Sequence, residues 1–340
     1  MYTQVTYAAH PTMSSPLGLR NPFSSLVAQL SPLEYPIADC VGRTVIITGA
    51  SSGLGLETAR HFVRLRSEKV ILGCRNLAKG EMAKKDIESS EGRPGVVEVW
   101  ELDLGSFDSV KSFCYRAEGL DRLDIVIENA GLSSKNYEVL EGYERQVTVN
   151  VISTFLMGVM LLPKLRKSAT ENSYPHLVFV ASNAHFYPTF EERNAPSIFN
   201  ALKGDAQMQW RYPVTKLLVV LIARELARQV SLSGTRDVII NFLDTGLCKT
   251  NLFRDEVFPM SWALAIAMFL VGRTCEMGSR VILWAALAGA ETHGKYIEDC
   301  HVSFESQFVR SEEGMISQVK AYTELLAILE SIQPGITKNV

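Results

Sequence analysis

The stretch of sequence that decides the fold is TVIITGASSGLG, which occupies residues 44–55. In it an apolar segment rich in β-branched residues runs directly into a glycine-rich turn, and a helical pattern follows from Leu56. Small residues in such a turn let backbone N–H groups approach a pyrophosphate, whose negative charge is favoured by the helix N-terminus. A dinucleotide-binding turn requires this context of a preceding strand and a following helix. An ordinary tight turn between a strand and a helix is the alternative.

The same alternation of apolar and amphipathic segments continues along the chain. Short, nearly all-apolar runs that predict strands occupy residues 44–48, 69–74, 96–102, 124–128, 176–182, 237–243 and 295–298. Amphipathic stretches that predict helices occupy residues 55–66, 77–89, 107–117, 143–165, 216–230 and 312–332. Apolar strands separated by helices are typical of a parallel sheet that is buried on both faces. The sequence therefore predicts an α/β fold, a doubly wound parallel sheet of about seven strands known as a Rossmann fold.

The N-terminal segment has a different character from the rest. Residues 1–41 are rich in proline and are predicted to form an irregular arm, while residues 42–340 are predicted to form one domain. No acidic residue precedes Glu34, which leaves a transit peptide open, although Arg20 is the only basic residue in that stretch.

Composition excludes several classes of protein. The 340 residues are 47% hydrophobic and 21% charged, which is ordinary for a globular protein and excludes a disordered, collagen-like or coiled-coil chain. A net charge of −3 gives no reason to expect binding to nucleic acid. The 6 cysteines form no CxxC pair, so neither a metal site nor a disulfide framework is expected, and the cytoplasm is the expected location. The longest apolar run, residues 262–272, is shorter than the roughly 20 residues of a transmembrane helix.

The spacing Gly49-x-x-x-Gly53-x-Gly55 differs from the commoner dinucleotide fingerprint and resembles the short-chain dehydrogenase/reductase family. Within that family, the retinol-dehydrogenase-like and fungal secondary-metabolism reductases are the most similar group. The resemblance covers roughly residues 42–300 and implies four catalytic residues, which are Ser182, Tyr212, Lys216 and Asn150. Each of these residue types is common when taken singly, but their order after the glycine turn matches the family.

The chemistry of a Tyr-x-x-x-Lys pair supports this assignment. Tyr212 and Lys216 lie four residues apart, hence on one face of a helix. A free phenol has a pKa near 10. An ammonium about 5 Å away, at an effective dielectric constant near 20, favours the phenolate by about 3 kcal/mol, or about 2 pKa units. We therefore expect Lys216 to lower the pKa of Tyr212. The resemblance further implies that Ser182 donates to the substrate carbonyl and that Asn150 anchors a water in a proton relay.

Arg75 indicates which nicotinamide cofactor is bound. In a dinucleotide fold the end of the second strand faces the adenosine ribose, where an acid suits NAD and an arginine suits the 2′-phosphate of NADP. Here the strand runs into Arg75 and Asn76 without an acid. Because a guanidinium binds phosphate through paired hydrogen bonds, NADP(H) is the predicted cofactor. The alternative is that Arg75 merely solvates the end of the strand.

Further cofactor contacts come from the resemblance. It implies that Asp103 contacts the adenine and that Thr250 contacts the nicotinamide carboxamide. Two positions depart from the family pattern: Glu128 replaces the first asparagine of an Asn-Asn-Ala-Gly segment, and Thr245 replaces a proline. The expected cofactor-binding residues are Gly49, Ser51, Ser52, Gly53, Leu54, Gly55, Arg75, Asn76, Asp103, Leu104, Asn129, Ala130, Gly131, Tyr212, Lys216, Gly246 and Thr250.

Two segments are expected to form the substrate cleft. Residues 183–210 are an aromatic-rich insertion after the catalytic strand, and residues 245–273 correspond to the lid of the family. The alternatives are that the insertion packs on the protein's own surface, and that the lid region packs in the core or touches a membrane. The expected substrate residues are Asn183, His185, Tyr187, Trp210, Phe253, Met260 and Trp262.

These observations predict an NADPH-dependent enzyme that reduces a ketone or aldehyde of a bulky apolar substrate, such as a polyketide or terpenoid in secondary metabolite biosynthesis. Tyr212 would act as the general acid. Two alternatives stay open: NADP-dependent oxidation of a retinol- or steroid-like alcohol, and a non-catalytic NADPH-binding sensor or scaffold. A small-molecule substrate is the expected partner, with no nucleic acid and no transmembrane segment, and a homodimer is left open.

Overall fold

The computed structural model describes residues 22–170, 173–234, 238–250, 252 and 269–340. At its centre lies an eight-stranded sheet with the order β10-β9-β8-β7-β4-β1-β2-β3. All neighbouring pairs are parallel except β9 and β10. The strands are β1 (Thr44–Thr48), β2 (Lys69–Cys74), β3 (Val97–Glu101), β4 (Ile125–Glu128), β7 (His176–Val180), β8 (Ile239–Asp244), β9 (Tyr296–Glu298) and β10 (His301–Ser303). The predicted parallel α/β fold is confirmed, with one antiparallel edge strand added.

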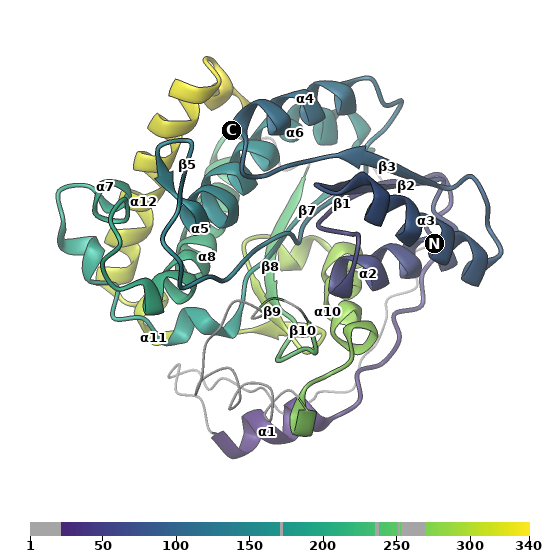
Figure 1. Ribbon diagram of the computed structural model, residues 1–340, viewed down its shortest axis with the longest axis horizontal. Coiled ribbons are helices and arrows are strands. Elements are labelled where there is room, and N and C mark those ends of the chain that lie inside the picture. The colour runs from purple at the N-terminus through teal and green to yellow at the C-terminus, as the bar shows by residue number, and fades with distance from the viewer. Residues whose placement is uncertain (1–21, 171–172, 235–237, 251, 253–268) are drawn as a thin grey trace.

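Helices cover both faces of the sheet (Figure 1). One layer consists of α2 (Gly53–Arg64), α3 (Leu77–Glu91) and α10 (Cys275–Leu287). The other contains α4 (Phe107–Glu118), α6 (Thr154–Ser168), α8 (Met208–Leu232) and α12 (Glu312–Ile332). Successive side chains of a strand point to opposite faces, so Ile46 packs in one core while Val45 and Ile47 pack in the other. This two-sided burial explains why the strands are apolar throughout.

The strand order reverses between β1 and β4, which is where an open α/β sheet binds its ligand. The turn after β1 and the segment after β4 meet at this edge. Thr48 Oγ1 accepts hydrogen bonds of 2.9 Å from the backbone N–H groups of Asn129 and Ala130. Asn129 Nδ2 donates to the carbonyl oxygen of Thr48 at 2.8 Å. These bonds join the two strand ends on which the candidate site is built.

The long helix predicted over residues 143–165 is interrupted. A short hairpin, β5 (Val139–Leu140) and β6 (Tyr143–Glu144), precedes it, with Glu141 and Gly142 both at positive φ in the turn. The helix then consists of α5 (Arg145–Val147), a π-helical segment (Thr148–Ser153) and α6. A π-segment inside a helix is frequently found at a functional site, and this one contains Asn150.

The N-terminal arm is not irregular throughout its described part. Residues Pro22–Leu30 form a helix, α1, so the prediction of an irregular arm is wrong for this stretch. The fixed φ of proline suits the first position of a helix, and no further proline follows before the helix ends. The proline content of residues 1–41 as a whole concealed this local signal.

The insertion between Ser182 and Tyr212 packs on the C-terminal helix. It contains two 3₁₀ turns (Asn183–Phe186 and Glu191–Asn194) and a short helix, α7 (Ile198–Ala201), which lies beside α12 (Figure 1). The carboxylate of Glu324 in α12 accepts from Ser197 Oγ at 2.8 Å and from the Ile198 N–H at 3.0 Å. Phe190 and Phe199 are buried in the core of this layer. The part of the insertion around Phe190, Ile198 and Phe199 therefore packs on the protein itself, whereas residues 203–207 are exposed.

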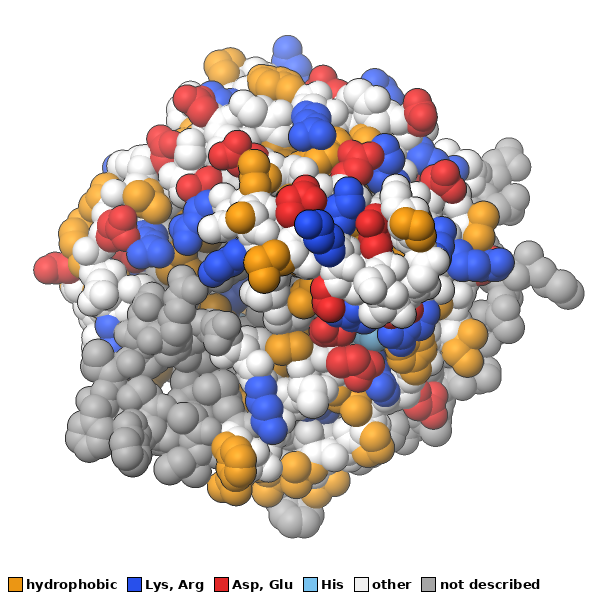
Figure 2. Space-filling view, turned by 45° about the vertical axis from the view of Figure 1, so that its right-hand side comes forward, with side chains coloured by type: hydrophobic (Ala, Val, Ile, Leu, Met, Phe, Trp, Pro, Cys, Tyr) orange, Lys and Arg blue, Asp and Glu red, His pale blue; other side chains and the backbone are white. Residues whose placement is uncertain are grey.

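One stretch of the described chain, residues 145–168, is long and apolar enough to cross a membrane by composition. In the structure 94% of its most apolar window is buried, as in the central helix of a globular core. On the face shown in Figure 2, acidic and basic side chains are interspersed. This mixture agrees with the small net charge of −3 and places no single-sign field on that face.

Candidate active site

A cavity of about 580 Å³ opens at the carboxyl ends of the central strands. Its wall comes from the glycine turn after β1, the segment after β4, the end of β7, the loop after β8 and one face of α8. Thirteen sequence-predicted residues lie on this wall, namely Gly49, Ser52, Gly53, Leu54, Asn129, Ala130, Gly131, Ser182, Asn183, Tyr212, Lys216, Gly246 and Thr250. The tertiary structure thus brings cofactor and catalytic candidates into one space.

The glycine turn forms a cradle that side chains would fill. A Cβ atom on Gly55 would lie 2.7 Å from Asn129 Nδ2 and 2.8 Å from the carbonyl oxygen of Gly49. Gly49 itself has a φ of +66° and packs against Ala130, where a Cβ would lie 3.0 Å from the Ala130 Cα atom. Ser52, the N-cap of α2, makes no side-chain capping bond, so its hydroxyl leaves the first-turn N–H groups uncapped. This arrangement fits the pyrophosphate of a dinucleotide.

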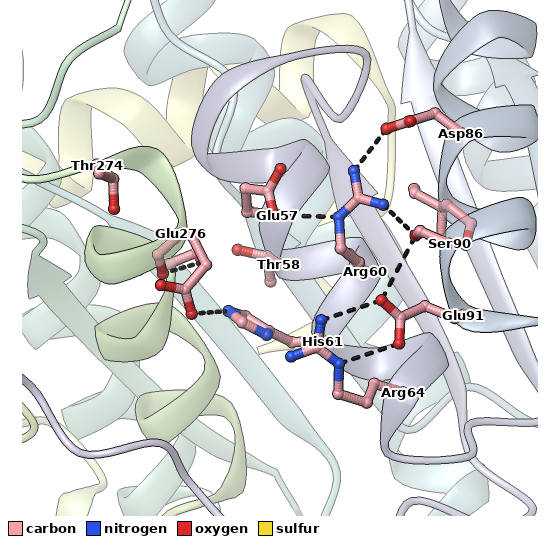
Figure 3. Close-up of polar contacts among 12 residues, drawn as sticks. Glu57, Thr58, Arg60, His61, Arg64, Asp86, Ser90, Glu91, Thr274 and Glu276 are labelled. Carbon is pink, nitrogen blue, oxygen red and sulfur yellow. Dashed lines mark hydrogen bonds and ion pairs between the residues drawn. The ribbon is translucent and has the colours of Figure 1, made fainter.

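Ion pairs hold α2 in place behind this turn (Figure 3). Arg60 in α2 contacts Asp86 of α3 at 2.5 Å, and Arg64 contacts Glu91 of α3 at 3.0 Å. Each partly exposed pair contributes little free energy by itself. They join α2 to α3, while the buried face of α2 packs it in the core of this layer.

His61 tethers the other side of α2. Its Nδ1 hydrogen-bonds the hydroxyl of Tyr35 at 2.8 Å, and its Nε2 lies 3.7 Å from Glu276 of α10 (Figure 3). Burial lowers the pKa of His61 to about 4, although Glu276 opposes the shift. His61 is therefore neutral at neutral pH, and its contact with Glu276 is not an ion pair under these conditions.

Glu128 stands at the end of β4, where the family pattern has an asparagine. Its side chain is fully enclosed, and its Oε2 lies 3.5 Å from Thr48 Oγ1. Burial raises the pKa of this carboxyl well above its usual range, more than the Thr48 contact lowers it. Glu128 is accommodated as a neutral acid that supports the strand end, and it does not line the cavity.

The residues expected at the adenosine end lie at the carboxyl ends of β2 and β3, beside the glycine turn. Arg75 is exposed, and no ion pair involves it in the described part of the chain. The Asn76 side chain caps α3 by accepting from the Lys79 N–H at 2.9 Å. Asp103 Oδ1 accepts from the Gly105 N–H at 2.9 Å. These residues lie outside the cavity wall, as do Ser51, Gly55 and Leu104.

Tyr212 and Lys216 project from α8 toward Ser182, which follows β7. The side chains of Tyr212 and Ser182 are hydrogen-bonded to each other. Lys216 Nζ donates to the carbonyl oxygen of Val180 at 2.7 Å and lies 5.9 Å from the centre of the Tyr212 ring. Ser182 Oγ also accepts from the Ala184 N–H at 3.1 Å, which orients the hydroxyl. The structure brings the three side chains together.

The direction of the Tyr212 pKa shift differs from the sequence expectation. Burial raises the pKa of Tyr212, and the hydrogen bond with Ser182 lowers it by less. Burial also lowers the pKa of Lys216 to about 8, against the attraction of Asp244. The expectation of a lowered tyrosine pKa is therefore wrong for the protein's own groups. It counted the Coulomb attraction of Lys216 but left out the cost of removing a phenolate from water.

Asn150 does not line the cavity, but it is hydrogen-bonded to Leu132, which does. Its Oδ1 accepts from the Leu132 N–H at 2.9 Å, and its Nδ2 donates to the Leu132 carbonyl at 2.9 Å and to Thr215 Oγ1 at 3.1 Å. It joins the π-segment to the loop after β4 and to α8 between Tyr212 and Lys216. Asn150 is a positioning residue in this geometry, and its role in a water relay stays a prediction.

The expected substrate residues have different locations. Asn183 lines the cavity, whereas His185 is buried between the Ser182 carbonyl (2.7 Å from Nδ1) and the Ser306 N–H (3.2 Å from Nε2). The structure does not bring Tyr187 and Trp210 to the wall, and both are exposed. Three further candidates lie outside the described residues, namely Phe253, Met260 and Trp262.

Sequence reasoning missed several lining residues. Asp244 ends β8 and enters the cavity, and Cys248 and Lys249 follow it in the loop. Their position directly after a strand of a parallel sheet was the available signal. Arg145 also lines the cavity while paired with Glu138 at 2.8 Å, and nothing in the local sequence distinguishes it.

The fold and site define a dinucleotide-binding oxidoreductase, and comparisons with known proteins agree. The family model of short chain dehydrogenases matches residues 43–194. The short chain dehydrogenase/reductase dmxR8 of Cryptosporiopsis sp. is 40% identical over 316 residues, which cover 90% of this chain and 96% of that protein. The short chain dehydrogenase atnD of Emericella nidulans is 41% identical over 278 residues, which cover 80% and 88%. The chain belongs to the short-chain dehydrogenase/reductase family.

Solved structures share the fold. An uncharacterized protein from Mycobacterium paratuberculosis is 26% identical with a TM-score of 0.63, and the match covers 87% of this chain and 95% of that one. A short-chain dehydrogenase from Sphingobium yanoikuyae, in complex with NADPH, is 21% identical with a TM-score of 0.55, covering 71% and 82%. The second likeness is evidence for the fold alone.

Proposed function

We propose that this protein is an NADP(H)-dependent reductase of a ketone or aldehyde carried by a bulky, largely apolar molecule. The observation that carries the proposal is one cavity whose wall holds the glycine turn together with Ser182, Tyr212 and Lys216. A bound NADPH supplies the hydride. The chain's own residues then have to hold the dinucleotide, orient the carbonyl and deliver a proton.

Each of these tasks has a candidate group. The uncapped N–H groups at the start of α2 bind the pyrophosphate. The hydroxyl of Ser182 donates to the carbonyl oxygen, where negative charge develops during reduction. The phenol of Tyr212 donates the proton that completes the alcohol. Lys216 is anchored on Val180, and its ammonium stabilises the phenolate that remains.

The protonated form of Tyr212 is the form that reduction requires. Because burial raises its pKa, the phenol keeps its proton at neutral pH. Reduction starts from a phenol that can donate a proton, whereas oxidation of an alcohol starts from a phenolate that can accept one. Oxidation of a retinol- or steroid-like alcohol is accordingly the second candidate.

The preference for NADP over NAD rests on Arg75. Its guanidinium is exposed at the end of β2 and forms no ion pair with any described residue, so it can bind a 2′-phosphate. Fold neighbours do not decide the matter, since one is a complex with NADPH and another, a 3-ketoacyl-(acyl-carrier-protein) reductase, is a complex with NADH.

A bulky apolar substrate is proposed from the sequence and is compatible with the cavity. The wall combines apolar and polar groups, and the volume of about 580 Å³ is shared between cofactor and substrate. A polyketide or terpenoid ketone of secondary metabolism is the proposed class. The cytoplasm as location, one domain over residues 42–340 and a homodimer stay predictions.

The test is an assay of the purified protein with NADPH and a panel of hydrophobic ketones and aldehydes. The consumption of NADPH is measured by its nicotinamide absorbance. Tyr212→Phe keeps the ring but lacks the proton donor, so we expect NADPH to bind and turnover to fall by at least about 100-fold. Reduction by Tyr212→Phe at the wild-type rate would refute the mechanism. Turnover only with NADP⁺ and alcohols would support the second candidate, and binding without any turnover would support a sensor or scaffold.

A further inference from the structure

We propose that the N-terminal helix α1 is part of the cofactor site, because Gln29 acts with Arg273 to position the loop 245–250. The loop follows β8 and contributes each of its six residues to the cavity wall. Helix α1 precedes β1 in the chain and lies outside the sheet. The proposal rests on the proposed dinucleotide-binding function only where cofactor affinity is concerned.

Gln29 joins three segments that are distant in sequence. Its Oε1 accepts from the Leu247 N–H at 3.1 Å, and its Nε2 donates to the Leu247 carbonyl at 2.8 Å. The same Nε2 donates to the Val271 carbonyl at 2.9 Å. One amide therefore pairs with both backbone groups of Leu247, as a neighbouring strand would. Any shift of Leu247 breaks these bonds together.

Arg273 also binds the loop 245–250, and it links the loop to the end of α1. Its guanidinium is buried, and Nη1 contacts Asp299 Oδ1 at 2.5 Å and the Thr245 carbonyl at 3.3 Å. The helix α1 supplies two further acceptors, since Nη2 donates to the Ala28 carbonyl at 2.6 Å and Nε to the Gln29 carbonyl at 3.2 Å. The end of α1 is thus bound to the first residue of the loop through a single buried cation.

The backbone of Arg273 also pairs with the loop. Its N–H donates to the Leu247 carbonyl at 2.8 Å, and its carbonyl accepts from the Lys249 N–H at 2.9 Å. Gly246, directly before Leu247, has a φ of +76°, and a Cβ atom there would stand 2.6 Å from Gln29 Oε1 and 3.0 Å from Arg273 Nη1. Only glycine permits the loop to approach both side chains so closely.

Asp299, whose carboxylate pairs with Arg273, lies in an unusual turn. Asp299 and Cys300 connect β9 to β10, and both have a positive φ, 51° and 62°. A two-residue hairpin turn with this geometry normally contains asparagine, aspartate or glycine, and cysteine is a poor fit. Such strained conformations persist where surrounding structure requires them. Here the turn places Asp299 against the buried guanidinium, which needs a counter-charge.

The test compares Gln29→Ala and Gln29→Met with Ser31→Ala in the full-length protein. Met preserves the bulk of the side chain without its hydrogen bonds. Ser31 directly follows α1, and among the described residues its hydroxyl bonds only the Val27 carbonyl of α1, so it serves as the matched control. The first measurement is backbone hydrogen exchange of residues 245–250 in the free protein. We expect both Gln29 variants to exchange about tenfold faster there, with an unchanged melting temperature, while Ser31→Ala matches the wild type.

The second measurement is NADPH affinity, read from nicotinamide fluorescence. We expect about tenfold weaker binding in the Gln29 variants, because the loop must then be ordered when the cofactor binds. Exchange in the Gln29 variants as slow as in Ser31→Ala would overturn the proposal. The exchange measurement needs no cofactor. A wild-type protein that bound no NADPH would overturn the proposed function, whereas the positioning of the loop by Gln29 and Arg273 would still be tested by hydrogen exchange.

Discussion

Lys216 Nζ donates a hydrogen bond of 2.7 Å to the carbonyl oxygen of Val180. This bond connects helix α8 to the end of strand β7, two positions before Ser182. It also fixes where the positive charge sits, 5.9 Å from the centre of the Tyr212 ring. The helix and the strand therefore cannot separate without breaking a charge-assisted bond in a buried place, so the distance between Ser182 and Tyr212 is held as well.

The charge of Lys216 predicts a pH limit on turnover. Burial lowers its pKa to about 8, so the ammonium is mostly protonated at pH 7 and loses its proton as pH rises through 8. If the charge stabilises the phenolate formed at Tyr212, kcat should fall about tenfold per pH unit above that value. The measurement is the pH profile of kcat at saturating substrate and NADPH. A flat profile from pH 7 to 10 would contradict the assignment.

The same lysine predicts a gain in stability when it is replaced. The unfolded state binds its proton up to pH 10.5, while the folded state releases it near 8, so wild-type stability rises with pH across this interval by about 1.4 kcal/mol per unit. Lys216→Met lacks this slope. Urea unfolding at pH 7 and pH 10 should show the wild type gaining stability relative to the variant. Equal slopes would mean that Lys216 is not buried as a charge.

Glu128 predicts the opposite dependence on pH. Its folded-state pKa lies well above 4.5, so between these values the unfolded state loses a proton that the folded state keeps. Wild-type stability should fall as pH rises above 4.5, by about 1.4 kcal/mol per unit until the folded carboxyl ionises. Glu128→Gln removes this loss and should be more stable than the wild type at pH 8. The exposed Glu118→Gln is the control, and an equal response of both variants would refute the interpretation.

The glycine cradle predicts a specific loss of cofactor binding. A methyl group on Gly55 would lie 2.7 Å from Asn129 Nδ2 and 2.8 Å from the Gly49 carbonyl, so the turn must open to accommodate it. We expect Gly55→Ala to weaken NADPH binding by at least about tenfold, because the N–H groups lose their alignment. Gly204→Ala is the control, since a Cβ there meets no atom within 4 Å. Fluorescence titration with NADPH measures the affinities of both variants. Equal affinities would show that the close packing around Gly55 is not required for cofactor binding.

Arg75 predicts the choice of cofactor. Removal of its guanidinium in Arg75→Ala should raise the KM for NADPH by about tenfold or more and leave the KM for NADH nearly unchanged. Lys85→Ala, an exposed cation further along α3, is the control. Equal effects on both cofactors would show that Arg75 does not recognise the 2′-phosphate.

Local patterns were sufficient for the sheet and the glycine turn. The bounds of β1 and β2 coincide with the predicted residues 44–48 and 69–74, because buried parallel strands need continuous apolar runs and end where polar or glycine residues begin. The helix from Glu312 to Ile332 was likewise predicted from its periodicity. Tyr212 and Lys216 were singled out through the family resemblance, and their spacing of four places them on one helix face whatever surrounds them.

Long-range contacts could not be predicted in this way. The helical part of the arm, the π-segment at Asn150 and the placement of Arg145 depend on residues far away in the sequence. The aromatic insertion illustrates the limit, because its composition suited a cleft, yet Phe190 and Phe199 pack in the core beside α12. Composition specifies that apolar groups will be buried and leaves open which surface buries them.

The sequence by itself determined the family, the parallel sheet and the glycine turn, because each depends on residues that are neighbours in the chain, and it named the candidate catalytic side chains. Only the tertiary structure decided the sign of the Tyr212 pKa shift and the attachment of α1 to the loop after β8. The first depends on burial, and the second on contacts between residues more than 200 positions apart, such as Gln29 and Leu247 with a separation of 218. Desolvation and distant hydrogen bonds are properties of the packed molecule, and no local pattern encodes them.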